Sequence, residues 1–414
     1  MKKIFKKSLI IAVSAGIATL SLQAQATNGY FSHGFGIKAK GMAGAGVAFS
    51  QDSLAAATNP AGMVLVGNRW DVGADVFVPD REATAIGGGP TVFDGNGDGF
   101  GETWFLIPEF GYNKMVNKNM SVGVSVFGNG GMNTTWNAPI FSAGAPTLNT
   151  GIDLSQLFIS PTLSIKLDDK NSLGVALNVV YQRIEVTGVG DFAGLSASPG
   201  NLSDNGYDSS FGVGFRVGWI GQLTDTVSVG FTYQPKTEME AFSKYSGLFA
   251  EGGEFDIPAN YAFGVSWKAT PKMTIALDAE QIKYSGIASI ANPNPTGALG
   301  SATGTGFGWE DMNVYKLGVA YQFNKDLVVR AGWNHGGQPI PAGQTLFNVL
   351  APAVVEDHLT LGFTMNMKDN AELSGYYMHA IEETLVGGGA GFAPNAATIG
   401  MSQNAFGIAY GKKF

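Results

Sequence analysis

Hydrophobic residues occupy every second position over long stretches of the chain beyond residue 70. The residues between them are mostly Gly, Ser, Thr, Asn or Gln. Successive side chains of a β-strand point to opposite faces, so this period of two predicts strands with one large apolar face and one small or polar face. The clearest examples are the segments 121–126, 173–182, 211–219, 227–234, 315–323 and 359–365.

The polar face of these predicted strands carries few charges, and charged residues make up only 14% of the chain. A soluble β-sandwich would also alternate, but it would place charged side chains on its outer face. Several predicted strands reach ~10 residues, the length that crosses a bilayer at a tilt. We therefore predict an all-β fold, a transmembrane antiparallel β-barrel, with the soluble sandwich as the alternative. Aromatic residues near the strand ends would form its interfacial girdle, namely Trp70, Trp104, Tyr181, Tyr233, Trp267 and Trp333.

The pattern predicts about fourteen strands between residues 69 and 414, an even number, as in bacterial single-chain barrels. Short polar turns are expected at the periplasmic rim and long connections at the extracellular rim. The long connections are 130–154, 187–209, 286–308, 336–355 and 383–402. The strands are expected to start near Arg69, Trp104, Asn119, Ser155, Asn171, Ser210, Asp225, Glu254, Pro271, Trp309, Asp326, Glu356, Asn370 and Gln403.

The end of the chain also indicates a barrel of the bacterial outer membrane. Phe414 is the last residue, and Tyr410, Ile408 and Phe406 lie on the same face of the last predicted strand. This ending resembles the terminal signal that the barrel-assembly machinery reads. We therefore expect that machinery and outer-membrane lipid as partners.

The first 26 residues have the pattern of a secretory signal peptide. Four lysines precede an apolar stretch at 8–22, and Ala24-Gln25-Ala26 gives a small-x-small cleavage site. A retained membrane anchor is the alternative, although the stretch is short for a ~20-residue span. Glycine and polar residues interrupt every later apolar run. Export without a later apolar helix leaves a soluble periplasmic protein or an outer-membrane barrel, and the alternation favours the barrel.

The composition excludes several kinds of chemistry. The chain has 25 basic and 33 acidic residues, 59 glycines and no cysteine among 414 residues. The lack of cysteine excludes disulfides, thiol nucleophiles and cysteine-ligated zinc. Nucleic-acid-binding surfaces are usually basic, so no nucleic-acid partner is expected. No cofactor is expected either, because Gly44-x-Gly46 lacks the third glycine of a dinucleotide-binding motif.

Residues 27–68 precede the first predicted strand and are rich in glycine. A barrel of about fourteen strands has a lumen too wide for its own side chains to fill. We therefore predict that 27–68 form a plug inside the lumen, where glycines allow close packing against the wall. A disordered tail is the alternative, but it would leave apolar residues such as Phe31 and Phe35 in water.

Two motifs carry a resemblance to a known family. The segment 55–62, which contains Asn59-Pro60-Ala61, resembles the hatch of the FadL/TodX-type outer-membrane transporters of hydrophobic compounds. The segment 127–132, which contains Asn129-Gly130-Gly131, resembles the end of that family's third strand, where an Asn-x-Gly kink opens the barrel wall. Further similarity lies at 232–246 and 357–362. The resemblance implies capture between extracellular loops, transfer to a pocket, and a hatch movement that lets the substrate leave sideways.

We accordingly assign Asn59, Pro60 and Ala61 to anchoring the plug, with an ordinary turn as the alternative. Proline restricts both its own backbone and that of Asn59, whose amide can bond nearby backbone. The lateral opening is assigned to Asn129, Gly130 and Gly131, because glycines let a strand ladder bulge or break. A simple strand end is the alternative there.

Apolar residues of the plug and of the loops are candidates for binding the substrate, and ordinary packing is the alternative for each. They are Phe31, Phe35, Trp136, Ile140, Phe141, Leu148, Phe192, Leu195 and Leu202. Lys38, Lys40 and Arg216 could pair with a fatty-acid carboxylate, or could be solvated or internally paired. The family's carboxylate-binding positions cannot be matched here, so passive uptake of long-chain fatty acids or of hydrocarbons is expected, by a monomer.

A competing site is a calcium loop at Asp94, Asn96 and Asp98, which alternate with glycines. An EF-hand needs a glutamate at the twelfth position, and Phe105 stands there. A polar loop is therefore favoured over a metal site. An outer-membrane hydrolase and an adhesin are the alternative functions, but no nucleophile-elbow pattern is present. We do not expect an enzyme.

Overall fold

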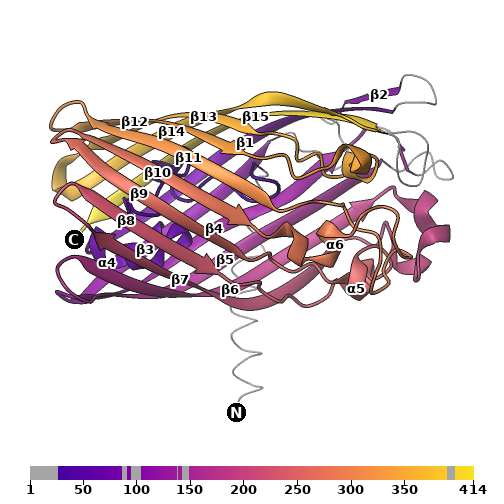
Figure 1. Ribbon diagram of the computed structural model, residues 1–414, viewed down its shortest axis with the longest axis horizontal. Coiled ribbons are helices and arrows are strands. Elements are labelled where there is room, and N and C mark those ends of the chain that lie inside the picture. Colours follow the sequence, from indigo (N-terminus) through magenta and orange to yellow (C-terminus); the bar gives the residue numbers. More distant parts are fainter. Residues whose placement is uncertain (1–26, 86–90, 95–103, 138, 142–148, 389–396) are drawn as a thin grey trace, which may run out of the picture.

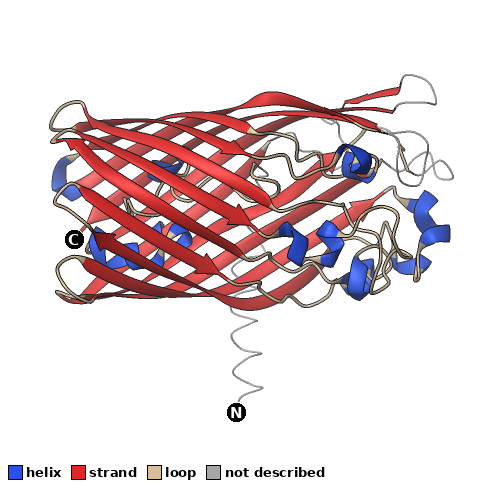
Figure 2. Cartoon of the chain, in the orientation of Figure 1, coloured by secondary structure: helices blue, strands red, loops and turns tan. Residues whose placement is uncertain are grey.

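A computed structural model describes residues 27–85, 91–94, 104–137, 139–141, 149–388 and 397–414. One antiparallel sheet closes on itself to form a long cylinder with strongly tilted strands (Figure 1, Figure 2). From β3 to β15 each strand pairs with the next in sequence, β1 pairs with both β2 and β3, and the last strand pairs with the first. The predicted signal peptide at 1–26 lies outside the described residues, so it stays a prediction.

The strands are β1 Arg69–Ala85, β2 Thr91–Asp94, β3 Phe105–Asn117, β4 Met120–Thr135, β5 Gly151–Lys166, β6 Asn171–Thr187, β7 Asp208–Gln222, β8 Val227–Gln234, β9 Asn260–Thr270, β10 Met273–Ile282, β11 Met312–Gln322, β12 Leu327–Gly336, β13 Asp357–Asn366, β14 Ala371–Val386 and β15 Ala397–Lys413. The helices are short: α2 Ile37–Lys40, α3 Ala55–Thr58, α4 Met63–Val66, α5 Ala250–Gly253 and α6 Ala288–Ala291. The 3-10 turns are η1 Pro60–Gly62, η2 Gly190–Leu195, η3 Pro199–Asn201, η4 Ser243–Tyr245, η5 Tyr284–Gly286, η6 Ala342–Gln344, η7 Phe347–Val349 and η8 Lys368–Asn370. Within the described ranges, no helix has the length and apolar character needed to cross a membrane.

The closed barrel has fourteen strands around its circumference, as the sequence predicts. β15 pairs with β1 along its whole length, from Arg69↔Lys413 to Ala85↔Ala397. The other edge of β1 pairs first with β3 and farther along with β2. β2 and β3 therefore share one position around the barrel. The short strand β2 was not predicted from the sequence.

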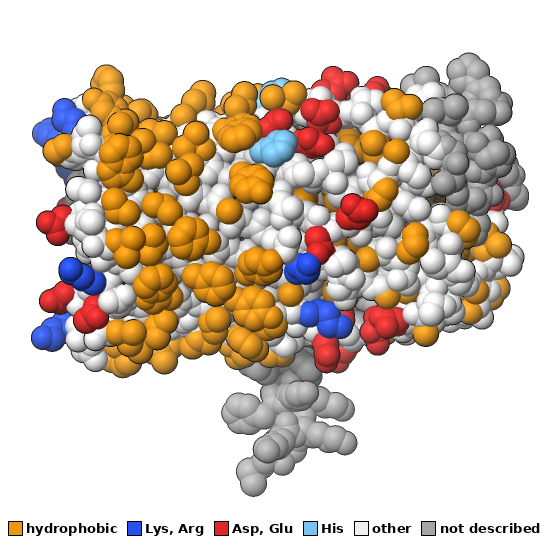
Figure 3. Space-filling model, viewed as in Figure 1, with side chains coloured by type: hydrophobic (Ala, Val, Ile, Leu, Met, Phe, Trp, Pro, Cys, Tyr) orange, Lys and Arg blue, Asp and Glu red, His pale blue; other side chains and the backbone are white. Residues whose placement is uncertain are grey.

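The large apolar residues of the strands face outward, as predicted. Val213 and Leu361 are 64% and 62% exposed, whereas Arg216 on the opposite face is buried. On the face seen in Figure 3, hydrophobic side chains gather over the half of the barrel nearest the C-terminus, and the other half is mostly polar. This arrangement gives the barrel an apolar band for the membrane and a polar extension beyond it.

The two rims differ as predicted. The C-terminus lies at the rim with the short turns, and α5 and α6 lie in the long connections toward the opposite end (Figure 1). Asp168 Oδ1 accepts hydrogen bonds from the backbone N–H groups of Lys170 and Asn171, both at 2.7 Å. Side-chain bonds of this kind stabilise tight turns, which explains the Asp- and Asn-rich sequences at this rim.

Residues 27–68, called the N-terminal segment below, pack against the inner faces of the strands. Tyr30, Ile37, Leu54 and Met63 are at most 1% exposed. The segment contains α2, α3, η1 and α4, all inside the cylinder in Figure 1. Glycines on the wall make room for it: a Cβ on Gly230 would lie 2.4 Å from the carbonyl oxygen of Val47.

Candidate functional site

The ladder between β3 and β4 ends before the strands do. Its last pair is Phe110↔Val126. β3 reaches Phe105 on one side, and β4 runs to Thr135 on the other, paired there with β5. The described residues therefore leave a gap in the backbone hydrogen bonding of the wall, bordered by the start of β3 and the second half of β4. We call this stretch the wall gap.

The predicted kink at 129–131 lies in the wall gap. The register of β4 against β5 shifts between Gly128 and Gly130, which places a bulge at Asn129. The N-terminal segment occupies the inner side of the bulge. Gly131 N donates to Tyr30 O at 2.8 Å, and Ser32 N donates to Asn129 O at 2.9 Å.

Gly130 is required by this contact. A Cβ at Gly130 would lie 1.8 Å from Tyr30 O, far inside van der Waals contact. β4 continues through this point to Thr135, so the glycines mark a bulge within the strand, and the backbone of the N-terminal segment lies against it. The passage of a substrate through this place stays a prediction.

Aromatic side chains line the inner side of the wall gap. The rings of Phe127 and Phe158 lie 5.4 Å apart, and half-buried Phe35 lies 4.9 Å from Phe127. Ile107 of β3 faces Gly128 of β4, where an added Cβ would lie 3.1 Å from the Ile107 side chain. Apolar side chains and the backbone of the N-terminal segment thus close the gap, in place of a β3–β4 ladder.

The side chain of Asn59 forms hydrogen bonds with other residues of the N-terminal segment and with the barrel wall. Its amide nitrogen donates to Val47 O at 2.8 Å and to Trp219 O at 3.1 Å, and its Oδ1 accepts from Ala61 N. Pro60 follows at the first position of η1. These contacts include the turn that was the alternative to the anchoring role, and the anchoring role itself stays a prediction.

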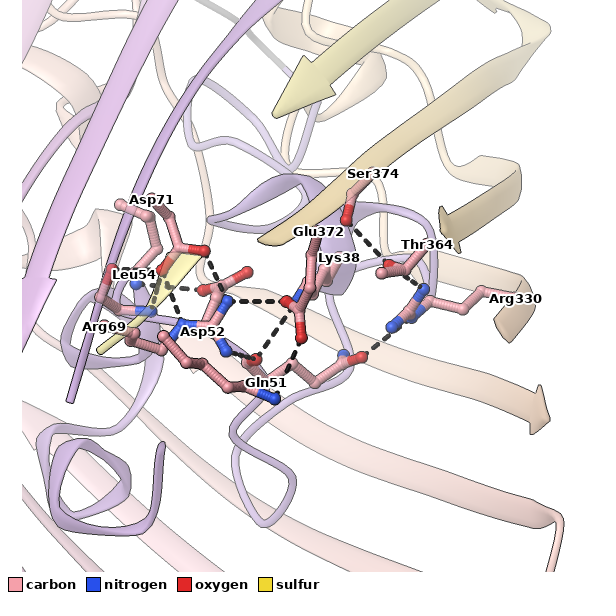
Figure 4. A network of polar contacts seen from close by, with 12 residues as sticks. Lys38, Gln51, Asp52, Leu54, Arg69, Asp71, Arg330, Thr364, Glu372 and Ser374 are labelled. Carbon is pink, nitrogen blue, oxygen red and sulfur yellow. Dashed lines mark hydrogen bonds and ion pairs between the residues drawn. The ribbon is translucent and has the colours of Figure 1, made fainter. Parts of the chain in front are cut away.

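A network of buried charges connects the N-terminal segment with β1 and β14 (Figure 4). Lys38 forms an ion pair with Glu372. Arg69 contacts Glu372 at 2.9 Å and Asp71 at 2.6 Å, and Asp71 accepts a hydrogen bond from Ser53 N. The network therefore holds both the α2 region and the region before α3 against the wall.

The three cations predicted as ligand contacts all have partners within the protein. Lys40 pairs with Asp75 of β1, as Lys38 does with Glu372. Arg216 donates to Gln234 Oε1 and Asn260 Oδ1, both at 3.1 Å. The structure thus shows the internally paired alternative for these side chains, and ligand binding by them is untested.

Sequence reasoning missed the acidic partners of this segment. Asp71, Asp75 and Glu372 lie on wall strands, and Asp278 of β10 accepts hydrogen bonds from Gly46 N and Val47 N. The available signal was a carboxylate on the small-residue face of a predicted membrane strand. Such a charge is costly unless something inside the barrel pairs with it.

The loop residues predicted to capture substrate belong mostly to one apolar cluster at the extracellular end. It includes Phe31, Trp136, Phe141, Phe192 and Leu202, and Phe35 and Ile140 pack against it. Trp136 Nε1 donates to Val349 O at 3.0 Å, and the rings of Phe141 and Phe192 lie 5.0 Å apart. Leu195 is exposed, and Leu148 lies outside the described residues.

The side chain of Tyr245 holds the long loop between β8 and β9 in place. Burial raises the pKa of Tyr245 to about 12, so its hydroxyl stays protonated at neutral pH. The hydroxyl lies 2.9 Å from Gly206 O, to which it donates, and accepts from Val186 N at 3.0 Å. The loop between β8 and β9 is thereby tied to β6.

Two of the spaces between the described residues border the N-terminal segment. A cavity of about 20 Å³ lies beside the wall gap, between Tyr30, Arg81, Met132 and Trp309. A larger, polar space of about 290 Å³ is lined by residues near the periplasmic rim, including Lys38, Gln51, Pro271, Lys272, Gln322 and Arg330. The small cavity is lined mainly by apolar side chains and one cation, whereas the lining of the large space is mostly polar.

The calcium candidate at Asp94, Asn96 and Asp98, over which a polar loop was favoured, stays untested. Asp94 ends β2, and Asn96 and Asp98 lie outside the described residues. Among the residues that are described, no group of three or more His, Asp or Glu side chains could hold a metal ion.

Comparisons with known proteins give a family and a set of similar folds. The family model for outer membrane protein transport proteins (OMPP1/FadL/TodX) matches residues 17–386. The Pseudomonas putida toluene transporter TodX is 17% identical, with a TM-score of 0.69, 92% of this chain and 99% of that chain covered. The Ralstonia pickettii toluene transporter TbuX is 18% identical, with a TM-score of 0.67 and the same coverage of 92% and 99%. A Pseudomonas aeruginosa FadL homologue is 16% identical, with a TM-score of 0.70 and coverage of 93% and 100%. No curated protein sequence matches the chain.

Proposed function

This chain belongs to the OMPP1/FadL/TodX family of outer-membrane transport proteins, and we propose that it takes up hydrophobic molecules through the wall gap between β3 and β4. The substrates would be aromatic hydrocarbons or long-chain fatty acids. The observation that carries this proposal is the end of the β3–β4 ladder at Phe110↔Val126. Because no backbone pairing joins β3 to β4 there, the gap can open without breaking the ladder between these two strands.

An apolar substrate has a physical reason to leave sideways. It gains nothing from a water-filled channel, because transfer from water to an apolar environment is the favourable step. A path from the apolar loop cluster through the wall gap would deliver it directly to the lipid. The apolar residues Phe35 and Phe127 stand on that path.

The N-terminal segment would act as the plug, with the boundaries 27–68 for the plug and 69–414 for the barrel. It occupies the lumen and hydrogen-bonds the inner side of the wall gap through Tyr30 and Ser32. Movement of these two residues would expose the gap. The ionic contacts of Lys38 and Lys40 would keep the rest of the plug in place.

The descriptions of the similar structures bear on the substrate only indirectly. Two are described as toluene transporters and one as a FadL homologue, which is said of those proteins. Their sequence identity to this chain is low, so they support the fold, and the substrate remains our proposal. The family match favours transport over the hydrolase and adhesin alternatives. We retain the proposals of a monomer surrounded by outer-membrane lipid, with Phe414 read during assembly.

A reversible staple across the wall gap tests the proposal. The chain has no cysteine, and Ile107 and Gly128 face each other across the gap, so I107C/G128C places two thiols within reach. Uptake of radiolabelled toluene and of radiolabelled oleate is measured in cells that express the protein in the outer membrane. We expect oxidation to abolish uptake and a membrane-permeant reductant to restore it.

The single variants I107C and G128C are the controls and should be insensitive to oxidation. Cross-linking is verified by a gel shift, and surface expression is matched. Undiminished uptake by the fully cross-linked protein would exclude the wall gap as the route.

A further inference from the structure

Two buried histidines meet where the N-terminal segment contacts the wall. His33 belongs to the segment and His358 to the inner face of β13, and neither side chain is exposed. Their ring centroids lie 6.2 Å apart and their planes differ by 13°, so the two imidazoles are stacked. The ring of His33 also lies 5.9 Å from the ring of Tyr376 on β14. The contact between segment and wall therefore includes a pair of titratable rings.

The surroundings of this pair suit neutral imidazoles. The backbone of Lys40 lies beside His33 and that of Asn334 beside His358. Among the described residues, no side chain hydrogen-bonds the nitrogens of either ring and no carboxylate forms an ion pair with them. A buried charge without a counter-charge is strongly unfavourable. The stacked contact is therefore compatible with the unprotonated form of both rings.

The other two histidines of the chain have a different environment. His335 is half-buried and His379 is exposed on the outer side of the barrel. His335 Nδ1 lies 3.1 Å from Asp357 Oδ1, and His379 Nδ1 lies 3.0 Å from Asn404 Oδ1. These rings can take up a proton beside water and a side-chain oxygen, and they do not touch the N-terminal segment. Protonation there leaves the contact of the segment unchanged.

The charged groups that act on the inner pair are largely cations. Lys40 of α2 and Lys316 of β11 both act electrostatically on His33, and Lys316 also acts on His358. The carboxylates of this region already contact other groups. They are Asp75 and Glu109 beside Lys40, Glu280 beside Lys316, and Asp357 beside His335 on the outer side. A proton on either inner ring would thus add a charge that has no carboxylate of its own.

His33 is adjacent to the residues that cover the inner side of the wall gap. Ser32 N donates to Asn129 O at 2.9 Å, and Phe31 forms a backbone bridge with Gly130. Because these residues are consecutive, movement of His33 away from β13 would shift Ser32 and Phe31 with it. The seat of His33 against the wall and the cover of the wall gap are therefore mechanically linked.

We propose that His33 and His358 form an acid-sensitive switch, in which protonation of the two rings separates the N-terminal segment from β13 and uncovers the wall gap. This inference rests on the proposed function and adds a regulation to it. A charged imidazole requires water or a counter-charge, and two charged rings in a stack repel each other. Both effects are relieved when the segment moves away from the wall.

The direction of the pH dependence follows from proton binding. An imidazole in water has a pKa of ~6.5, and burial lowers the pKa of His33 well below its ordinary value while the segment is seated. A released segment therefore binds more protons than a seated one below about pH 6.5, so acid favours release. At neutral pH and above, both states are unprotonated and the seat of the segment is unaffected.

Release of the segment can be measured without any substrate. The full protein is reconstituted into lipid bilayers at about pH 7.5 and at about pH 5, on either side of the ordinary imidazole pKa. One readout is the ion conductance. The other is hydrogen exchange at 30–36, expressed relative to the intrinsic exchange rate at each pH so that only the protection by structure is compared.

We expect the protection at 30–36 in the wild type to fall by about 10-fold or more on acidification, since a pKa difference of one unit corresponds to ~10-fold. The conductance should rise in parallel. H33Q/H358Q keeps polar side chains but cannot take up a proton, and it should lose this response. The control H379Q changes an exposed histidine of the outer surface and should keep it.

Two results would overturn the inference. One is equal protection and conductance of the wild type at both pH values, which requires no variant. The other is a wild-type pH response in H33Q/H358Q whose folding is verified by heat-modifiable migration on gels. The cysteine staple I107C/G128C tests the route separately: uptake by the fully stapled protein would exclude the wall gap as the route, whereas the pH response alone decides whether the switch exists.

Discussion

Lys38 of the N-terminal segment forms a buried ion pair with Glu372 at the start of β14, although 334 positions separate them in the sequence. Arg69, next to the start of the barrel, shares the same carboxylate at 2.9 Å. One wall residue therefore holds both the segment and the strand that follows it. Asp75 and Asp278 also contact the segment, so its attachment is shared among several wall carboxylates, of which Glu372 is one.

Replacement of that carboxylate should loosen the segment. E372Q leaves Lys38 buried without its charge partner, and breaking a buried pair from one side typically costs ~3–5 kcal/mol. We expect faster hydrogen exchange at 36–42 and a larger ion conductance in planar bilayers.

The double variant K38M/E372M should restore much of the protection, since apolar replacement of a buried pair is often neutral. E240Q, which changes an exposed glutamate, is the control for charge alone. Equal exchange in E372Q and the wild type would show that the ion pair does not hold the segment.

The amide of Asn59 should contribute to the local stability of the same segment. N59A removes the donor to Val47 O and Trp219 O and the acceptor for Ala61 N. Loss of a buried hydrogen-bonding group costs ~1–3 kcal/mol, so we expect exchange at 47–62 to rise by about 10-fold or more. N119A, in an exposed turn, should change nothing there.

The space at Gly174 should be essential for seating the segment. An added Cβ would lie 2.2 Å from the carbonyl carbon of Pro60. G174V should therefore yield a folded barrel with a displaced segment, seen as increased conductance with unchanged heat-modifiable migration on gels. G190V is the matched control, because no atom lies within 4 Å of a Cβ placed there. Wild-type conductance in G174V would contradict the close packing.

The outward apolar face should tolerate no charge within the membrane band. Leu361 is 62% exposed on β13, and a lysine on the lipid face of a barrel costs ~2–4 kcal/mol near the midplane. We expect L361K to lower the free energy of unfolding from lipid vesicles by about this amount. L195K, at an exposed loop position, should lower it by less than ~0.5 kcal/mol. Similar losses in both variants would indicate that Leu361 does not face lipid.

Local sequence patterns predicted the wall well because its signals are short in range. The alternation around Val213 and Leu361 needs only the strand period, since a shift of one residue would turn every apolar side chain inward. The turn at Asp168 likewise depends on neighbouring backbone alone. The motif at Asn59 marked a bend of the backbone before η1. The motif at Gly130 marked a point where the N-terminal segment lies close to the backbone of β4.

The same patterns predicted the contacts of charged residues poorly. Lys38 and Lys40 could be located on the segment. Their partners, however, lie far apart in the sequence: Glu372 is on β14 and Asp75 is on β1. Nothing local to a lysine indicates which strand will face it.

By itself the sequence determined the strand number, the faces of the strands, the rims and the position of the strand interruption, because each follows from spacing along the backbone. Only the tertiary structure decided that the β3–β4 ladder stops at Phe110↔Val126, that Tyr30 accepts a hydrogen bond from Gly131 at the kink, and that Lys38 pairs with Glu372. These features are hydrogen bonds and ion pairs between segments that are distant in sequence. They form only when the barrel closes around its N-terminal segment.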